Sequence, residues 1–171
     1  MKKVLILITL LSSIYGSQNP KFIDSIYNNN IKKKVFIKQG IDINAKDNDG
    51  ETPLLDAIDN NNFKIVKFLL KNGANINAKN KNWNPLLKAT YNNYSNISKF
   101  LVIKGANINA KNNLGGTALM MVCKNGNLNL VKFLLKHGAK TNIKNLFGGT
   151  AIDVAKTHKH KKIVEYLKKE K

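Results

Sequence analysis

The chain has 171 residues, one cysteine and a formal net charge of +19, carried by lysine because the sequence contains no arginine. One cysteine excludes an intramolecular disulfide, and the length suits one domain of ordinary size. The lysine excess has two open explanations: an AT-rich coding sequence, which favours Lys, Asn and Ile, or an acidic partner, namely a nucleic acid, an anionic surface or an acidic protein. The lack of arginine disfavours a specific reader of nucleic acid, since bidentate phosphate recognition favours arginine.

Residues 1–18 have the three parts of a secretory signal peptide. Two lysines precede an apolar run from Val4 to Leu11, and small residues that include Gly16 follow it. The run is shorter than the roughly 20 residues that a membrane-spanning helix needs. We therefore expect the mature chain to begin near Ser17, without a transmembrane span, and to be exported to the periplasm or secreted. The alternatives are an uncleaved N-terminal anchor and a merely apolar first helix.

A unit of about 33 residues then recurs along the chain, and residues 47–79 show it most clearly. A turn rich in Asn, Asp and Gly precedes Thr52-Pro53, an N-cap followed by proline at the first helical position. We expect a short helix that ends at the Asn60–Asn62 break, and a second helix from Phe63 to about residue 72. Gly73 stands where a helix favours a left-handed C-terminal residue.

The same signals return in phase at intervals of 32 or 33 residues. The helix-ending glycines are Gly40, Gly73, Gly105 and Gly138. An asparagine four residues later repeats as Asn44, Asn77, Asn109 and Asn142. Small or β-branched residues on the first helix recur as Ser25, Ala57, Ala89, Val122 and Ala155.

The unit resembles an ankyrin repeat, with Asp-x-x-Gly-x-Thr-Pro-Leu at its front and Val-x-x-Leu-Leu-x-x-Gly-Ala-x-Ile-Asn-Ala at its back. The resemblance implies an all-α ankyrin-repeat solenoid, built from helix–turn–helix repeats with β-hairpin fingers. It covers residues 19–171 as one domain. The repeats fall at about 21–46, 47–79, 80–111, 112–144 and 145–171.

Three departures from the pattern lead to further expectations. The first repeat lacks the turn and the Thr-Pro start, as expected of a terminal cap. The third repeat is one residue short in the turn Asn80–Trp83, and Asn84 takes over as N-cap before Pro85. The histidine that the family often places after Thr-Pro-Leu is replaced, so we expect its local hydrogen bond to be absent, at Leu55, Leu87, Met120 and Asp153.

No constellation in the sequence indicates catalysis, a cofactor or a metal. The histidines are His137, His158 and His160, and no cysteine or close carboxylate completes a ligand set with them. We expect them to be solvent-exposed near helix ends. Cys123 falls on a first helix, where we expect it to be buried and inert. We therefore predict that the protein is not an enzyme and holds no cofactor.

The resemblance implies instead that a concave surface of fingers and first helices binds a protein partner, whose identity the sequence does not give. Trp83 and Tyr91 are the expected anchors, because aromatic residues dominate binding hot spots. For Trp83 the alternative is that it patches the shortened turn, and for Leu114 and Phe147 that they pack finger against finger. The full set of predicted partner-binding residues is Asp49, Glu51, Asp59, Lys81, Trp83, Tyr91, Leu114, Lys124, Phe147 and His158.

Acidic residues are clustered: residues 60–152 contain no Asp or Glu, whereas the second repeat contains several. We expect a groove whose acidic end carries Asp49, Glu51 and Asp59 and whose basic end carries Lys81, Lys88 and Lys124, with Trp83 and Tyr91 between. The alternative is that the acidic residues merely solvate the second repeat. We expect a monomer. The second candidate function is weak polyanion binding, of nucleic acid or an anionic surface, through lysine-rich faces.

Overall fold

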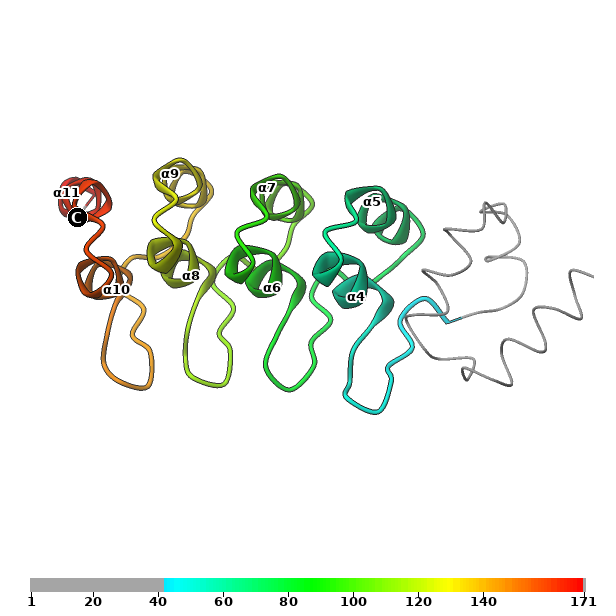
Figure 1. Cartoon of the computed structure of the whole chain (residues 1–171). Coiled ribbons are helices and arrows are strands. Elements are labelled where there is room, and N and C mark those ends of the chain that lie inside the picture. The colour runs from blue at the N-terminus through cyan, green and yellow to red at the C-terminus, as the bar shows by residue number, and fades with distance from the viewer. Residues whose placement is uncertain (1–41, 171) are drawn as a thin grey trace, which may run out of the picture.

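The computed structural model describes residues 42–170, where eight helices are stacked in two rows (Figure 1). The inner row holds the first helix of each repeat: α4 (Pro53–Asp59), α6 (Pro85–Tyr91), α8 (Ala118–Asn125) and α10 (Ala151–Thr157). The outer row holds the second: α5 (Phe63–Lys71), α7 (Ser95–Ile103), α9 (Leu128–Lys136) and α11 (Lys161–Lys169). The predicted all-α repeat solenoid is confirmed. The predicted signal peptide and nearly all of the first repeat lie outside the described residues.

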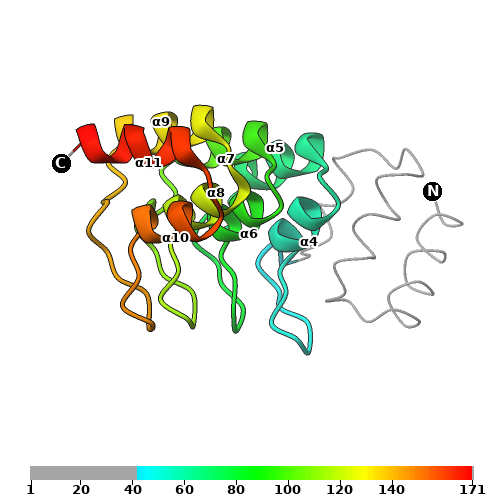
Figure 2. The same cartoon turned by 60° about the vertical axis from the view of Figure 1, so that its left-hand side comes forward.

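Between successive helix pairs the chain runs out into a loop, here called a finger, and all fingers project from the side of the inner row (Figure 2). No strand is assigned within residues 42–170. The fingers are closed by backbone hydrogen bonds such as that from Asp47 N–H to Glu51 O at 3.0 Å. They are therefore hydrogen-bonded turns rather than the β-hairpins with strands that the resemblance implies.

The starts of the inner helices are fixed by the predicted N-caps. Thr52 Oγ1 accepts a hydrogen bond from Leu55 N–H at 3.3 Å, and Asn84 Oδ1 accepts one from Leu87 N–H at 2.9 Å. Each bond satisfies an amide that has no partner inside the helix, which is why these short helices begin where they do. Asn84 thus replaces threonine as the cap of the shortened third repeat, as predicted.

The expected loss of the local hydrogen bond after each helix start is wrong for the last repeat. Asp153 Oδ2 accepts hydrogen bonds from Thr150 N–H at 3.1 Å and from Thr150 Oγ1–H at 2.7 Å. A carboxylate at the third helical position reaches back to the cap in the same way as in a capping box. Asp153 therefore makes, with its carboxylate, a local hydrogen bond to the helix start at the position where the family often has histidine.

The core is a continuous layer between the rows, and small residues allow the inner helices to pack closely. Ala57, Ala89, Val122 and Ala155 are buried, as their periodicity predicts. Each inner helix contacts the inner helix of the next repeat and the outer helix of its own. Because each repeat buries its apolar face on its neighbours, stability comes from the interfaces between repeats. In the described part of the chain, no helix has the length and apolar character needed to cross a bilayer.

The repeating asparagines tie one repeat to the next. Asn77 Oδ1 accepts a hydrogen bond from Asn107 N–H at 2.9 Å. Asn109 Oδ1 accepts one from Lys140 N–H at 2.9 Å, and its Nδ2 donates to Gly138 O at 3.0 Å. The asparagine period in the sequence is therefore explained by backbone groups of the next repeat that need a partner.

Candidate binding site

A groove of about 630 Å³ runs between the fingers and the inner helices of the last three repeats. It brings together most of the predicted binding residues, namely Trp83, Tyr91, Leu114, Lys124, Phe147 and His158. The rest of its lining consists of Asn82, Asn112, Asn113, Gly116, Met120, Met121, Asn145 and Val154. Its surface is largely apolar, as is usual for sites that bind side chains of a partner.

The remaining predicted residues lie outside this groove. Lys81 is exposed at the tip of the third-repeat finger, and Asp49 is exposed at the tip of the second-repeat finger. Glu51 and Asp59 belong to a separate network described below. The structure therefore separates the predicted set into an apolar groove over repeats three to five, an acidic region on repeat two, and Lys81 alone on the third-repeat finger.

The position of the groove follows from what each repeat places at equivalent positions. The residue at the base of the finger is Glu51 in the second repeat, Trp83 in the third and Gly116 in the fourth. A side chain is thus missing at Gly116, where an added Cβ would lie 2.8 Å from the Cε of Met121. The ring of Trp83 forms a wall of the groove, while the place of a side chain at Gly116 is occupied by Met121 and Asn112.

Trp83 is the last residue of the shortened third-repeat finger (residues 80–83). Asn80 N–H donates to Trp83 O at 3.0 Å, so the turn closes over four residues, whereas the second-repeat finger closes over five. The five-residue finger has Gly50 in the left-handed region, at φ 76°. The short finger has no residue with positive φ. It keeps the side-chain bond of the longer one, since Asn80 Oδ1 accepts Trp83 N–H at 2.7 Å as Asp47 Oδ1 accepts Glu51 N–H at 2.9 Å. The deletion therefore lies in the turn, as predicted.

Trp83 and Tyr91 form the aromatic side of the groove. Their ring centroids are 4.8 Å apart, with the planes tilted by 48°. Trp83 is half-buried, while Tyr91 remains 46% exposed. Lys124 Nζ lies 5.4 Å from the centroid of the Tyr91 ring, in range of a cation–π contact. The two rings contact each other, and the Tyr91 ring still has surface open to solvent.

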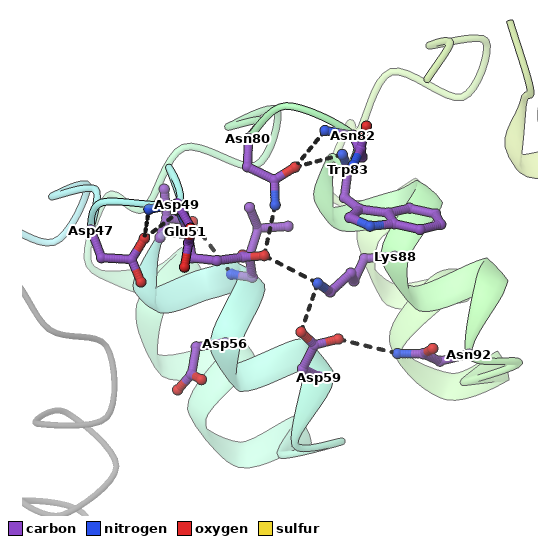
Figure 3. A network of polar contacts seen from close by, with 12 residues as sticks. Asp47, Asp49, Glu51, Asp56, Asp59, Asn80, Asn82, Trp83, Lys88 and Asn92 are labelled. Carbon is purple, nitrogen blue, oxygen red and sulfur yellow. Dashed lines mark hydrogen bonds and ion pairs between the residues drawn. The ribbon is translucent and has the colours of Figure 1, made fainter. Parts of the chain in front are cut away.

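Two acidic residues of the second repeat, Glu51 and Asp59, are bound to Lys88 of the third (Figure 3). Lys88 Nζ lies 2.6 Å from Asp59 Oδ2 and 3.2 Å from Glu51 Oε1. Glu51 Oε1 also accepts a hydrogen bond from Asn80 Nδ2 at 2.6 Å, and Asp59 Oδ1 accepts one from Asn92 Nδ2 at 3.3 Å. The network joins a finger and two inner helices of neighbouring repeats.

The sequence led us to expect Lys88 as a free cation at the basic end of the groove. That expectation is wrong, because Lys88 is paired with Glu51 and Asp59. Burial lowers its pKa, but the hydrogen bond to Asp59 and the charges of Glu51 and Asp59 outweigh that effect and raise the pKa above its ordinary value of 10.5. The residue stays charged and neutralises the carboxylates beside it. Its ion-pair partner Glu51 lies 37 residues earlier in the chain, on the other side of a repeat interface.

Two further titratable residues in the described part of the chain, Cys123 and His160, are held by burial and by local contacts. Cys123 is fully buried, and burial raises the pKa of its thiol to about 12, so it stays protonated as predicted. His160 is half-buried rather than exposed, because its Nε2 lies 2.9 Å from Lys124 O and its ring lies against Gly126. Among residues 42–170, no group of three His, Cys, Asp or Glu residues is placed to hold a metal ion.

Sequence reasoning missed the floor of the groove. Met121 and Val154 line it, and each occupies the place that Lys88 has in the third repeat. Aligning the repeats one under another would have found them, because equivalent positions of a repeat array face the same way. Taken alone, each is an ordinary apolar residue on an inner helix.

The comparisons with known proteins agree with this architecture. The family model described as ankyrin repeats (3 copies) matches residues 22–112 and again residues 86–171. The search of curated proteins returns no significant match. Because the two matches together span most of the chain, and the described residues show the helix pairs and fingers in sequence, the chain belongs to the ankyrin-repeat family.

Proposed function

We propose that the protein is a non-catalytic binding module that presents the groove over repeats three to five to a protein partner outside the cytoplasm. Ankyrin repeats generally serve as protein–protein interaction modules. The observation that supports this groove is the aromatic pair of half-buried Trp83 and exposed Tyr91 in its largely apolar lining. Aromatic side chains in a preorganised pocket contribute most to binding energy at protein interfaces.

The test is a capture experiment from the envelope fraction and culture fluid of the source cells, with the doubly altered chain Trp83→Ala, Tyr91→Ala. We expect the unaltered chain to retain a partner that the double variant loses. The matched control is Tyr166→Ala, which removes an aromatic residue of α11 that packs against the core away from the groove. A partner retained equally by all three chains would contradict the assignment of the groove.

Export is the second part of the proposal, and it rests on the sequence of residues 1–18. A positive start, a short apolar run and small residues have the order that signal peptidase substrates share. N-terminal sequencing of the native protein should find a chain that begins near Ser17 in a non-cytosolic fraction. An intact Met1 or Lys2 in the cytosol would refute export while leaving the binding role untouched.

The competing candidate is polyanion binding through lysine. The net charge of +19 favours it. The groove does not, since its lining within residues 42–170 contains a single lysine, Lys124. We therefore place this function second and expect any such binding to be weak.

A further inference from the structure

The groove offers a partner an apolar floor with one cation beside it. Within the described residues, its lining contains Lys124 and no aspartate or glutamate. The carboxylate of Asp153, next to the lining residue Val154, is bound to Thr150 and Lys156. Those of Glu51 and Asp59 in repeat two share the charge of Lys88. The field in the groove is therefore set by an ammonium group next to exposed rings, with no carboxylate in the described lining to neutralise it.

The groove, of about 630 Å³, has room for a bulky side chain of a partner. Trp83 and Tyr91 line it together with Leu114 and Phe147 of the neighbouring fingers. Phe147 is 81% exposed and Leu114 is 56% exposed, so both have apolar surface left to cover. Burial of such surface by an aromatic or branched aliphatic residue is the main gain that the groove can provide.

The charge of Lys124 favours a particular kind of residue beside the side chain that a partner would bury in the groove. Lys124 Nζ is drawn over the Tyr91 ring, 5.4 Å from its centroid, at the edge of the apolar space. An incoming carboxylate meets a localised positive charge there, with no acidic residue in the described lining to repel it. A phosphate backbone would need several cations along one track, and the groove lining supplies only this lysine within the described residues.

We infer that the partner docks through a short acidic peptide segment, in which an aromatic or branched aliphatic anchor is flanked within a few residues by Asp or Glu. The anchor enters between Trp83 and Phe147, and a flanking carboxylate pairs with Lys124. This inference rests on the proposed function and names the chemistry of the partner at that same groove. Repeat two takes no part in it, because none of its residues lines the groove and its Glu51 and Asp59 are paired with Lys88.

Selection of random peptides on the immobilised full chain tests the inference. We expect enriched peptides to combine an aromatic or leucine anchor with nearby acidic residues. Their affinity should fall at least about fivefold for Lys124→Glu and by less for Lys124→Gln, since charge reversal adds repulsion to the loss of attraction. Lys140→Glu, which makes the same charge change outside the groove, should leave affinity unchanged.

The controls separate failure of the inference from failure of the proposed function. Peptides that need Trp83 and Tyr91 but carry no acidic excess, or that bind Lys124→Glu as well as the unaltered chain, overturn the inference alone. Peptides that bind the Trp83→Ala, Tyr91→Ala chain unchanged overturn both. Displacement of the peptides by a thymidine oligonucleotide, or by phosphatidylglycerol vesicles, would also overturn the inference in favour of a nucleic acid or a membrane. Thermal melting of each variant checks that it is folded.

Discussion

Lys88 has a structural role although it lies at a position that lines the groove in later repeats. Its ammonium group lies between Glu51 and Asp59, and its side chain is 11% exposed. Glu51 Oε2 is buried and meets no hydrogen-bond donor in the described part of the protein. Any change that removes the lysine therefore leaves carboxylates close together without their counter-charge.

We expect Lys88→Met to destabilise the fold by about 2 kcal/mol. Removing one partner of a fully buried ion pair costs about 3–5 kcal/mol, and partial exposure of the carboxylates should roughly halve that cost. Urea denaturation measures the change, with Lys140→Met as control. Adding Glu51→Gln and Asp59→Asn to Lys88→Met should recover part of the loss. No recovery would mean that packing of the lysine stem, rather than charge, is responsible.

Asp153 gives the last repeat a measurable dependence on pH. The hydrogen bond from the Thr150 side chain, followed by that from the Thr150 backbone, lowers the pKa of this carboxyl from 3.8 to about 2. Its stabilising effect is therefore present above about pH 4 and is lost as the pH falls through about 2. The effect is small, because nearly half of the side chain is exposed to solvent.

NMR titration of the Asp153 carboxyl should give a midpoint near 2. Thr150→Val removes the larger hydrogen bond and should move the midpoint up toward 3.8. Thr157→Val is the matched control, since Thr157 Oγ1–H donates to the Asp153 backbone carbonyl instead. A midpoint that rises equally in both variants would show that the helix, and not the carboxyl contact, has changed.

At the scale of elements, the third-repeat finger shows how a deletion is absorbed. The turn lacks the glycine with positive φ and closes one residue earlier, while α6 still begins at its Asn84 cap. The deletion does not shift the helix, because the cap and Pro85 fix its start independently of the finger. The length of the turn can thus change in this repeat without a shift of the helix that packs in the core.

Insertion of a glycine between Asn82 and Trp83 should therefore be tolerated. The longer turn regains the spacing of the fourth-repeat finger (residues 112–116), whose closing hydrogen bond from Asn112 N–H to Gly116 O is 3.0 Å long. We expect the free energy of unfolding to change by less than about 1 kcal/mol, as is usual for a compatible loop extension. Thermal unfolding and tryptophan fluorescence measure it. A larger decrease would show that the short turn itself holds Trp83 against Tyr91.

At the scale of the whole molecule, the sequence predicts what is local and periodic. The helix caps, the small residues of the inner row and the turn deletion follow from short patterns that each repeat carries by itself. The network of Lys88 could not be predicted that way, because it depends on which side chains two neighbouring repeats bring together. The half-burial of His160 against Gly126 has the same origin. Of the residues that line the candidate groove, the sequence predicted Trp83 and Tyr91 but not Met121 and Val154.

Several lysines make contacts within the protein itself. Lys46 Nζ donates to Lys79 O at 2.9 Å, and Lys111 Nζ donates to Lys144 O at 3.3 Å. In each case the acceptor lies 33 residues later, in the next repeat. Other lysines lie over aromatic rings on the outer row, where their carbon stems cover apolar surface: Lys67, Lys99, Lys104 and Lys132. These roles spread the positive charge over the back of the solenoid and do not focus it in one track.

Binding to DNA or heparin should accordingly be weak and should fall steeply with salt. A spread of exposed lysines attracts polyanions by releasing counterions, and this gain shrinks as the salt concentration of the solution rises. Fluorescence anisotropy with a labelled duplex, measured between about 50 mM and about 200 mM salt, should show binding that is gone at the upper end. Lys124→Glu and Lys140→Glu should weaken it equally, since each removes a similar share of the field. A sub-micromolar affinity that survives about 200 mM salt would instead indicate a specific nucleic-acid surface and reverse the order of the two proposed functions.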